Sequence, residues 1–391
     1  FYCKIYSRYY PLIMKTIAIV AGESSGDLLG SHLIKSLKAT RSDLKFIGVA
    51  GPKMVKEGAI SYFPMEELSV RGYFEAIKKL FHLLKLRRNL LNQILDAKPD
   101  LFIGVDAPDF NFWIERQLKK KGIPVIHYVS PSIWAWRGGR LKMIKKSIDH
   151  MLTIFPFERK IYSKANIEAT FVGHPLAEMI PLSPNKKKAQ AKLKIIKATK
   201  VIALLPGSRQ GEVKWHAQLL IDSAIELSKK IRDVKFLVPL PTRETYDIFS
   251  RALFKNTDAE LDIQLLIGHA SDAINAADLV IVASGTATLE TALYKKPMVV
   301  IYKMSSISWQ ILKRMRYLPY VSIPNILLNK FFVPELLQKE ATPENITSKA
   351  IEILKDAPYR KNLLIQFTKI HHQLKQNTSV RLNKIILKFI K

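Results

Sequence analysis

The chain has 391 residues, of which 48% are hydrophobic and 24% charged, a balance typical of folded globular proteins and not of disordered chains. Its formal net charge of +29 favours anionic partners, such as nucleic acid, an acidic membrane surface or a phosphorylated substrate, without deciding among them. The single cysteine, Cys3, excludes a disulfide framework and a thiolate metal site and fits a cytoplasmic protein. No apolar run approaches the ~20 residues of a transmembrane helix.

The chain begins with a stretch, Phe1–Ile13, that lacks the apolar centre and small-residue cleavage site of a signal peptide. Because Met14 stands directly before the first predicted strand, we interpret residues 1–13 as an extension without functional weight. A chain of this length is expected to form two domains of roughly 150–200 residues each. We predict an N-terminal domain at 14–180, a linker at 181–200, a C-terminal domain at 201–355 and C-terminal helices at 356–391.

The first half alternates short apolar runs with segments of helical periodicity. The predicted strands are Thr16–Ala21, Lys45–Ala50, Leu101–Val105, Val125–Val129 and Met151–Ile154. The predicted helices are Gly26–Ala39, Phe74–Ala97, Phe110–Lys121 and Gly139–Ile148. Nearly continuous apolar strands that alternate with helices indicate a parallel sheet covered on both faces.

The second half repeats the alternation after Pro181, Pro184 and a run of three lysines. Its predicted strands are Val201–Leu205, Val234–Val238, Ile263–Ile267, Leu279–Ala283 and Met298–Ile301, and the chain is predicted to be helical after Pro343. The fold class is therefore α/β, with two Rossmann-like parallel sheets. Ligands of such sheets collect at the carboxyl ends of the strands, so two facing sheets would form a cleft.

Two turns in the second half are typical of phosphate sites. Leu204–Glu212 and Ala283–Glu290 each follow an apolar run and open a helical segment, whose first N–H groups and dipole suit an anion. Arg209 could pair bidentately with phosphate oxygens, and Glu290 could accept hydrogen bonds from a ribose. Small-residue turns follow strands in any α/β protein, so either motif alone is weak. Together the two motifs favour a nucleotide diphosphate.

In the first half, polar residues follow two strands. The turn Gly22–Asp27 has the wrong glycine spacing and two acids for a dinucleotide site, and it suits hydroxyls or an amide instead. Asp106 stands at the end of Leu101–Val105, before a proline, where a carboxylate can act as general base toward a hydroxyl. The alternative is that one of the acids caps the following helix, and Asp109 is the expected N-cap, which leaves Asp106 for chemistry.

A loop at Tyr128–Arg140 carries Trp134 and Trp136, which could stack on a sugar, line an acyl groove or form a satellite core. His174 could line the cleft, although packing or a hinge position is favoured. No histidine pair has metal-ligand spacing, and the chain has no Asp-x-Asp motif. We therefore expect no metal and no cofactor, with arginine and helix dipoles stabilising a leaving diphosphate.

Two basic amphipathic stretches, Ile77–Leu95 and Ile307–Leu318, could lie on an anionic membrane surface. The usual alternative is a surface helix with its apolar stripe in the core. The residues predicted to meet the membrane are Ile77, Leu80, Phe81, Leu84, Lys85 and Arg88.

From about Thr16 to its C-terminal helices, the chain resembles the lipid-A-disaccharide synthases, glycosyltransferases of the two-Rossmann-domain (GT-B) type. The resemblance rests on long motifs that follow in the family's order: Ala21–Asp27, Val105–Asn111, Ser130–Arg137, Phe171–Leu176, Leu205–Arg209, Ser284–Glu290 and Tyr320–Asn325.

The resemblance implies an inverting transfer in the lipid A biosynthesis of Gram-negative bacteria. UDP-2,3-diacylglucosamine would donate its sugar to the 6-hydroxyl of 2,3-diacylglucosamine 1-phosphate, giving a β(1→6) disaccharide 1-phosphate and UDP. Asp106 and Arg209 would be catalytic, and Glu23, Ser24, Asp27 and Asp106 would bind the acceptor. The implied UDP-sugar contacts are Gly207, Ser208, Arg209, Gln210, Ser284, Gly285, Thr286, Ala287, Thr288, Glu290 and Asn325.

The resemblance also implies C-terminal helices that pack back on the N-terminal domain, and peripheral attachment to the inner face of the inner membrane. The sequence does not decide between a monomer and a homodimer. Another GT-B enzyme of UDP-sugars, an epimerase or a soluble glycosyltransferase, is the alternative, and it would not need the basic amphipathic helices. A non-enzymatic binder of nucleic acid is disfavoured, because no nucleic-acid motif is present.

Overall fold

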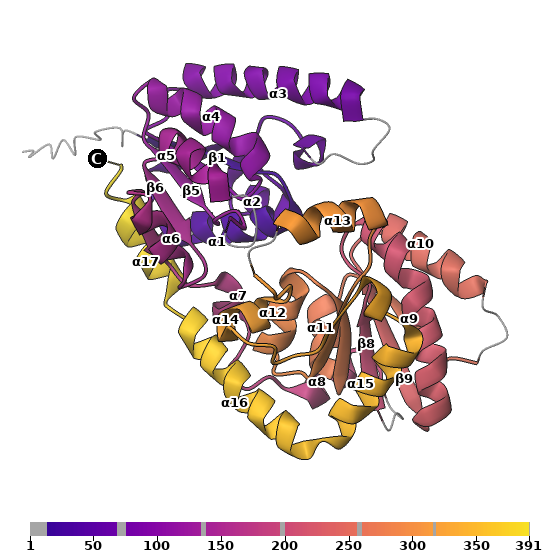
Figure 1. Ribbon diagram of the computed structural model, residues 1–391. Helices are drawn as coiled ribbons and strands as arrows, with labels where there is room; N and C mark the ends of the chain where they lie inside the picture. Colours follow the sequence, from indigo (N-terminus) through magenta and orange to yellow (C-terminus); the bar gives the residue numbers. More distant parts are fainter. Residues whose placement is uncertain are drawn as a thin grey trace, which may run out of the picture. The chain divides into compact units, whose positions relative to one another are not determined.

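The structure, a computed structural model, describes residues 14–68, 76–133, 138–195, 200–255, 260–315 and 318–390. The chain divides into two compact units (Figure 1). Unit 1 runs to Pro175 and takes in Lys375–Lys391, and unit 2 is Leu176–Leu374. The proposed extension at residues 1–13 lies outside the described residues. Within the described part of the chain, no helix combines the length and the apolar character that a membrane span requires.

Unit 1 is built on a seven-stranded parallel sheet with the order β3-β2-β1-β4-β5-β6-β7. Its strands are β1 (Lys15–Ala21), β2 (Leu44–Val49), β3 (Ala59–Ser61), β4 (Leu101–Val105), β5 (Val125–Tyr128), β6 (His150–Thr153) and β7 (Ala169–Phe171). β1 and β4 are buried along most or all of their length, which explains their continuous apolar sequences.

Helices cover this sheet. They are α1 (Ser24–Thr40), α2 (Pro52–Lys56), α3 (Ala76–Asp96), α4 (Pro108–Lys120), α5 (Leu141–Ser147), α6 (Glu158–Lys164) and α17 (Thr378–Ile386), with 3₁₀ turns η1 (Met65–Leu68) and η2 (Gly138–Arg140). α3 packs on α4 and α4 on α5. α17 packs on α1, where Ser36 Oγ donates to Asn383 Oδ1 at 2.9 Å. The expected return of the C-terminal helices to the N-terminal domain is confirmed for α17.

Unit 2 has a six-stranded parallel sheet with the order β10-β9-β8-β11-β12-β13. Its strands are β8 (Lys200–Leu205), β9 (Val234–Leu240), β10 (Ile263–Ile267), β11 (Leu279–Ala283), β12 (Met298–Tyr302) and β13 (Glu335–Leu337). Its helices are α7 (Pro175–Met179), α8 (Lys186–Lys192), α9 (Gln210–Lys230), α10 (Arg243–Phe254), α11 (Ala270–Ala276), α12 (Thr286–Leu293), α13 (Ser306–Met315), α14 (Ile323–Leu328), α15 (Pro343–Lys355) and α16 (Ala357–Leu374), with the 3₁₀ turn η3 (Gln338–Glu340).

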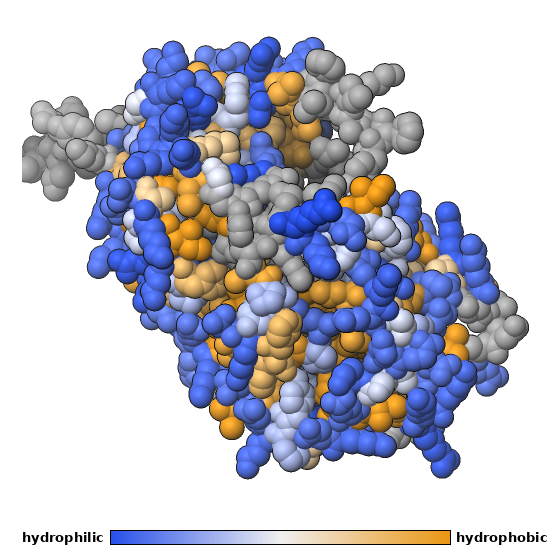
Figure 2. Space-filling model, viewed as in Figure 1, coloured by the Kyte–Doolittle hydropathy of each residue, from blue (hydrophilic) through white to orange (hydrophobic). Residues whose placement is uncertain are grey.

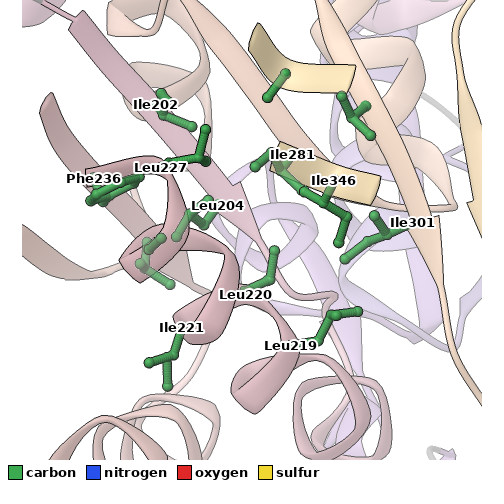
Figure 3. Packing of buried hydrophobic residues seen from close by; sticks show 14 of the residues in the cluster. Ile202, Leu204, Leu219, Leu220, Ile221, Leu227, Phe236, Ile281, Ile301 and Ile346 are labelled. Atoms are coloured by element: carbon green, nitrogen blue, oxygen red, sulfur yellow. The ribbon is translucent and has the colours of Figure 1, made fainter. Parts of the chain in front are cut away.

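The core of unit 2 lies between its sheet and the helices α9 and α15 (Figure 3). Ile202 and Leu204 of β8 and Ile281 of β11 meet Leu220 of α9 and Ile346 of α15, all with 0% exposure. Apolar side chains at period 2 on the strands and at helical spacing on α9 bring these faces together. This packing holds the ends of β8 and β11 in fixed positions.

Both sheets reverse their strand order at one point. In unit 1 the neighbours β1 and β4 pair Ala21 with Val105, and in unit 2 the neighbours β8 and β11 pair Leu205 with Val282. In each sheet, the connections that follow the two strands of this pair run to opposite sides. Such a reversal opens a crevice for ligands at the carboxyl ends of the two strands. All four predicted functional turns directly follow these strands.

Candidate active site

In unit 1, the turns after β1 and β4 are in contact. Ser25 Oγ in the first turn of α1 donates to Asp106 Oδ2 at 3.4 Å, and Asp106 N–H donates to Tyr128 O of β5 at 2.9 Å. The position of Asp106, one residue beyond β4, is as predicted. Ser25 is a contact that sequence reasoning missed, although it stands in the motif that contains Glu23, Ser24 and Asp27.

The expected cap of α4 is wrong. The N-cap position belongs to Ala107, which has no capping side chain, and the helix begins with Pro108. Asp109 lies in the first turn, where its carboxylate pairs with Arg140 Nη2 at 2.5 Å. Asp109 is thus engaged by another helix terminus, and Asp106 remains the acid directed at Ser25.

The three acceptor residues predicted in the turn after β1 have different surroundings. Glu23 is exposed at the N-cap of α1, and the side chain of Ser24 lies outside the described residues. Asp27 is only 3% exposed, and its two carboxylate oxygens accept the N–H groups of Lys53 and Met54 at 3.0 and 2.9 Å. This corrects the predicted role of Asp27, because its carboxylate holds the first turn of α2.

In unit 2, the turn after β8 exposes Ser208, Arg209 and Gln210 at the start of α9. Gly207 has φ +119°, a backbone conformation that requires glycine. Glu212 Oε2 accepts the N–H groups of Ser208 and Arg209 at 2.9 and 3.3 Å. The Glu212 carboxylate thus occupies the N–H groups of Ser208 and Arg209, which we predicted for a phosphate.

A buried histidine that sequence reasoning missed ties this turn to β12. His216 has 0% exposure; its Nδ1–H donates to Pro206 O at 2.7 Å and its Nε2 accepts the Lys303 N–H at 2.9 Å. Burial lowers the pKa of His216, and the hydrogen bond to Pro206 opposes this shift. Only the neutral ring with its proton on Nδ1 satisfies both contacts.

The turn after β11 leads into α12 through Ser284 and the N-cap Gly285. Gly285 and Thr286 are exposed, Ser284 and Ala287 are half-buried, and Ser284 Oγ donates to Val321 O at 2.8 Å. Thr288 is buried; its hydroxyl donates to Gly285 O at 2.8 Å and accepts the Ile323 N–H at 3.2 Å. Thr288 therefore shapes the turn, while the first N–H groups of the helix, at Thr286 and Ala287, open to an anion.

Glu290 lies one turn further along α12 and is half-buried. Burial raises the pKa of its carboxyl above the ordinary value, and a 2.5 Å hydrogen bond from Ser271 Oγ of α11 opposes this shift. Ser271 is a second contact missed from the sequence, because it is distant in the chain and carries no motif. Its hydroxyl orients one oxygen of the Glu290 carboxylate.

Asn325 corrects another prediction. It is fully buried in α14, and its amide donates to Val333 O at 2.9 Å and to Glu335 Oε1 at 2.8 Å. Its carbonyl oxygen accepts the N–H groups of Phe332 and Val333 at 2.8 and 2.9 Å. These four bonds use all the capacity of the amide, so its side chain organises the loop before β13 and has none left for a donor sugar.

The sequence also singled out aromatic residues in other segments of the chain. Trp134 and Trp136 fall outside the described residues. His174 is 4% exposed with its ring 5.7 Å from that of Phe155, which confirms the packing interpretation. Within the described residues, no group of three or more His, Cys, Asp or Glu side chains has the geometry of a metal site.

The helix α3, for which the sequence allowed either a membrane contact or an apolar stripe in the core, has a buried part and an exposed part. Leu90 and Ile94 are buried with 0% exposure, whereas Leu84, Lys85 and Arg88 are exposed. The side chains of Ile77, Leu80 and Phe81 lie outside those that the structure describes. In unit 2, Ile307 of α13 is 77% exposed. Hydrophilic residues otherwise dominate the visible surface of each unit (Figure 2).

Known structures share this architecture. UDP-GlcNAc 2-epimerase from Neisseria meningitidis, solved with UDP-GlcNAc, matches with a TM-score of 0.66 at 13% identity, covering 96% of this chain and 100% of that chain. MurG from Acinetobacter baumannii matches with a TM-score of 0.55 at 15% identity, covering 96% and 99%. At such identities the likeness concerns the fold alone. It defines the class: a GT-B protein, the fold of glycosyltransferases and epimerases.

Sequence relatives identify the family. A family model described as lipid-A-disaccharide synthetase matches residues 17–389. The lipid-A-disaccharide synthase of Methylobacillus flagellatus is 53% identical over 378 residues, covering 97% of this chain and 100% of that protein. That of Azoarcus sp. is 49% identical over 374 residues, covering 96% of each. The chain belongs to the lipid-A-disaccharide synthetase family and is a glycosyltransferase.

Proposed function

We propose that the chain transfers the sugar of UDP-2,3-diacylglucosamine to 2,3-diacylglucosamine 1-phosphate, with formation of the β(1→6) disaccharide 1-phosphate and release of UDP. The observation that carries this proposal is the family match over residues 17–389, together with relatives at about half identity that bear the same enzyme name. The two turns at each strand-order reversal supply the groups that such a reaction needs.

In the proposed mechanism, Asp106 accepts the proton of the acceptor's 6-hydroxyl while that oxygen attacks the anomeric carbon from the face opposite the diphosphate. The bond to the diphosphate breaks as the new bond forms, so an α-linked donor gives a β-linked product. Arg209 and the first N–H groups of α12 stabilise the negative charge on the leaving UDP. Glu290 accepts hydrogen bonds from the ribose.

We further propose that the enzyme works at an anionic membrane surface, since both substrates carry acyl chains. The exposed Leu84, Lys85 and Arg88 of α3 support this, because an apolar side chain beside two cations suits a lipid interface.

Product analysis with synthetic donor and acceptor tests the proposal. We expect a product whose mass equals donor plus acceptor minus UDP, with one UDP released per disaccharide and a β anomeric signal in the NMR spectrum. A reaction without acceptor is the control and should release no UDP. UDP release without a disaccharide, or a donor epimerised at the sugar, would favour the epimerase alternative.

A further inference from the structure

A buried asparagine connects the two turns of unit 1. Asn111 has 0% exposure and lies in the first turns of α4. Its Nδ2 donates to Asp106 O at 2.8 Å and to Val20 O at 3.3 Å. Val20 belongs to β1 and Asp106 follows β4, so one amide group ties the two strand ends from which the acceptor-side turns depart.

The backbone that Asn111 holds is strained. Asp106 and Ala107 have φ values of +53° and +44°, the left-handed region that residues with a Cβ rarely adopt. Such conformations persist only where the surrounding contacts impose them. Here the Asp106 N–H is bound to Tyr128 O and the Asp106 carbonyl to Asn111, while a Cβ at Gly22 would lie 2.7 Å from the Ala107 Cβ.

We propose that Asn111 is a positioning residue, which fixes the left-handed backbone of Asp106 and thereby directs its carboxylate to the acceptor hydroxyl. This inference rests on the proposed role of Asp106 as base. The Nδ2 atom of Asn111 faces the two strand ends, because it donates hydrogen bonds to the carbonyl oxygens of Val20 and Asp106. A side chain of similar size without N–H groups would leave both carbonyls without this partner.

A second contact keeps α4 in register for this role. Glu115, one turn beyond Asn111 on the same face, has its Oε1 2.6 Å from His127 Nδ1 of β5, and both side chains have 0% exposure. Gly104 of β4 lies beneath this pair, where an added Cβ would approach Glu115 Oε1 to 2.0 Å. The close approach of helix and sheet brings the Asn111 amide within reach of the strand ends.

The test is a double-mutant cycle of Asn111→Leu and Asp106→Asn. In the otherwise native enzyme, we expect N111L to lower kcat by about 10- to 100-fold, as for a misplaced catalytic group, with the KM of the acceptor and the Kd of UDP unchanged. In the D106N enzyme, whose kcat is expected to be at least ~100-fold below native, N111L should leave the residual rate unchanged. Ser147→Ala, which removes a buried hydroxyl that bonds Met143 O within α5, is the matched control and should retain kcat.

An equal fall in kcat from N111L in both backgrounds would show a general structural role and overturn the inference. A native kcat in N111L, with D106N inactive, would also overturn it, because Asp106 would then work without Asn111. A native kcat in D106N would instead remove Asp106 as the base and with it the proposed mechanism. Thermal unfolding checks that each variant is folded, and Asn111→Ala replaces N111L in the cycle if the leucine is not accommodated.

Discussion

At the scale of single residues, the turn after β8 separates the backbone of Arg209 from its side chain. Glu212 binds the N–H groups of Ser208 and Arg209, and our proposal assigns the diphosphate contact to the Arg209 guanidinium. We predict that Arg209→Ala raises the Kd of UDP about 10- to 100-fold, the loss of a charge-assisted bidentate contact, and that Arg209→Lys restores part of the affinity. Isothermal titration calorimetry measures the effect.

The control for this prediction is Arg251→Ala, which removes an exposed arginine from α10 of the same unit and should leave the Kd of UDP unchanged. If R209A binds UDP as tightly as the native enzyme, the diphosphate site lies away from the turn after β8.

The sequence predicted which residues lie at the ends of strands better than it predicted which groups their side chains bind. Asp106, Arg209 and Glu290 follow strands whose apolar runs are unmistakable, so their places at strand ends could be inferred. The internal roles of Asp27 and Asn325 could not, because their partners at Lys53, Met54 and Glu335 are set by tertiary packing. A motif identifies a residue without showing whether its polar atoms face a ligand or the protein.

At the scale of the elements, α3 divides its surface between the core and solvent. Leu90 and Ile94 are buried, while Lys85 and Arg88 are exposed beside Leu84. We predict that the double variant Lys85→Glu/Arg88→Glu binds vesicles of phosphatidylglycerol and phosphatidylethanolamine at least ~10-fold more weakly, since each basic residue near an anionic surface contributes about 1 kcal/mol. Cosedimentation at about 0.15 M salt measures the partition.

The matched control is Lys187→Glu/Lys188→Glu on α8, which reverses two exposed charges and lowers the net charge by the same amount. It should bind vesicles as the native protein does. Equal weakening in both double variants would assign vesicle binding to the overall positive charge, and no weakening in either would remove α3 as the contact.

The long elements could be predicted from periodicity, and several strands, such as Leu101–Val105 and Ile263–Ile267, have the predicted bounds. Three strands were missed: Ala59–Ser61, Ala169–Phe171 and Glu335–Leu337. Each has three residues, lies at the edge of its sheet and is not buried along its whole length, so it carries neither an apolar run nor a clear alternation. Edge strands depend on the neighbouring strand for their conformation more than on their own residues.

At the scale of the whole molecule, buried histidines make stability depend on pH. Burial lowers the pKa of His174 to about 4, and it also lowers the pKa values of His150 and His216. The unfolded chain takes up these protons below about pH 6.5, whereas the folded chain resists, so stability is fully present above that pH and is lost as pH falls toward 4. For His174 alone, the loss between pH 7 and pH 5 is about 2 kcal/mol.

Urea unfolding at pH 7 and pH 5 checks this expectation. On acidification, the unfolding free energy should fall more for the native protein than for His174→Asn. The difference between the two losses should approach the loss given above for His174 alone. His372→Asn, which changes an exposed histidine of α16, is the control. Identical losses in the native protein and H174N would mean that His174 takes up its proton in the folded state as readily as in the unfolded chain.

The membership of α17 in unit 1 has a consequence for biosynthesis. Most of this unit precedes unit 2 in the chain, yet the surface of α1 that receives α17 stays uncovered until Thr378–Ile386 has left the ribosome. Unit 2, which is contiguous from Leu176 to Leu374, can be completed earlier. Unit 1 is therefore completed only after unit 2 has been translated, and a stop codon between Leu374 and Thr378 would leave α1 without the helix that packs on it.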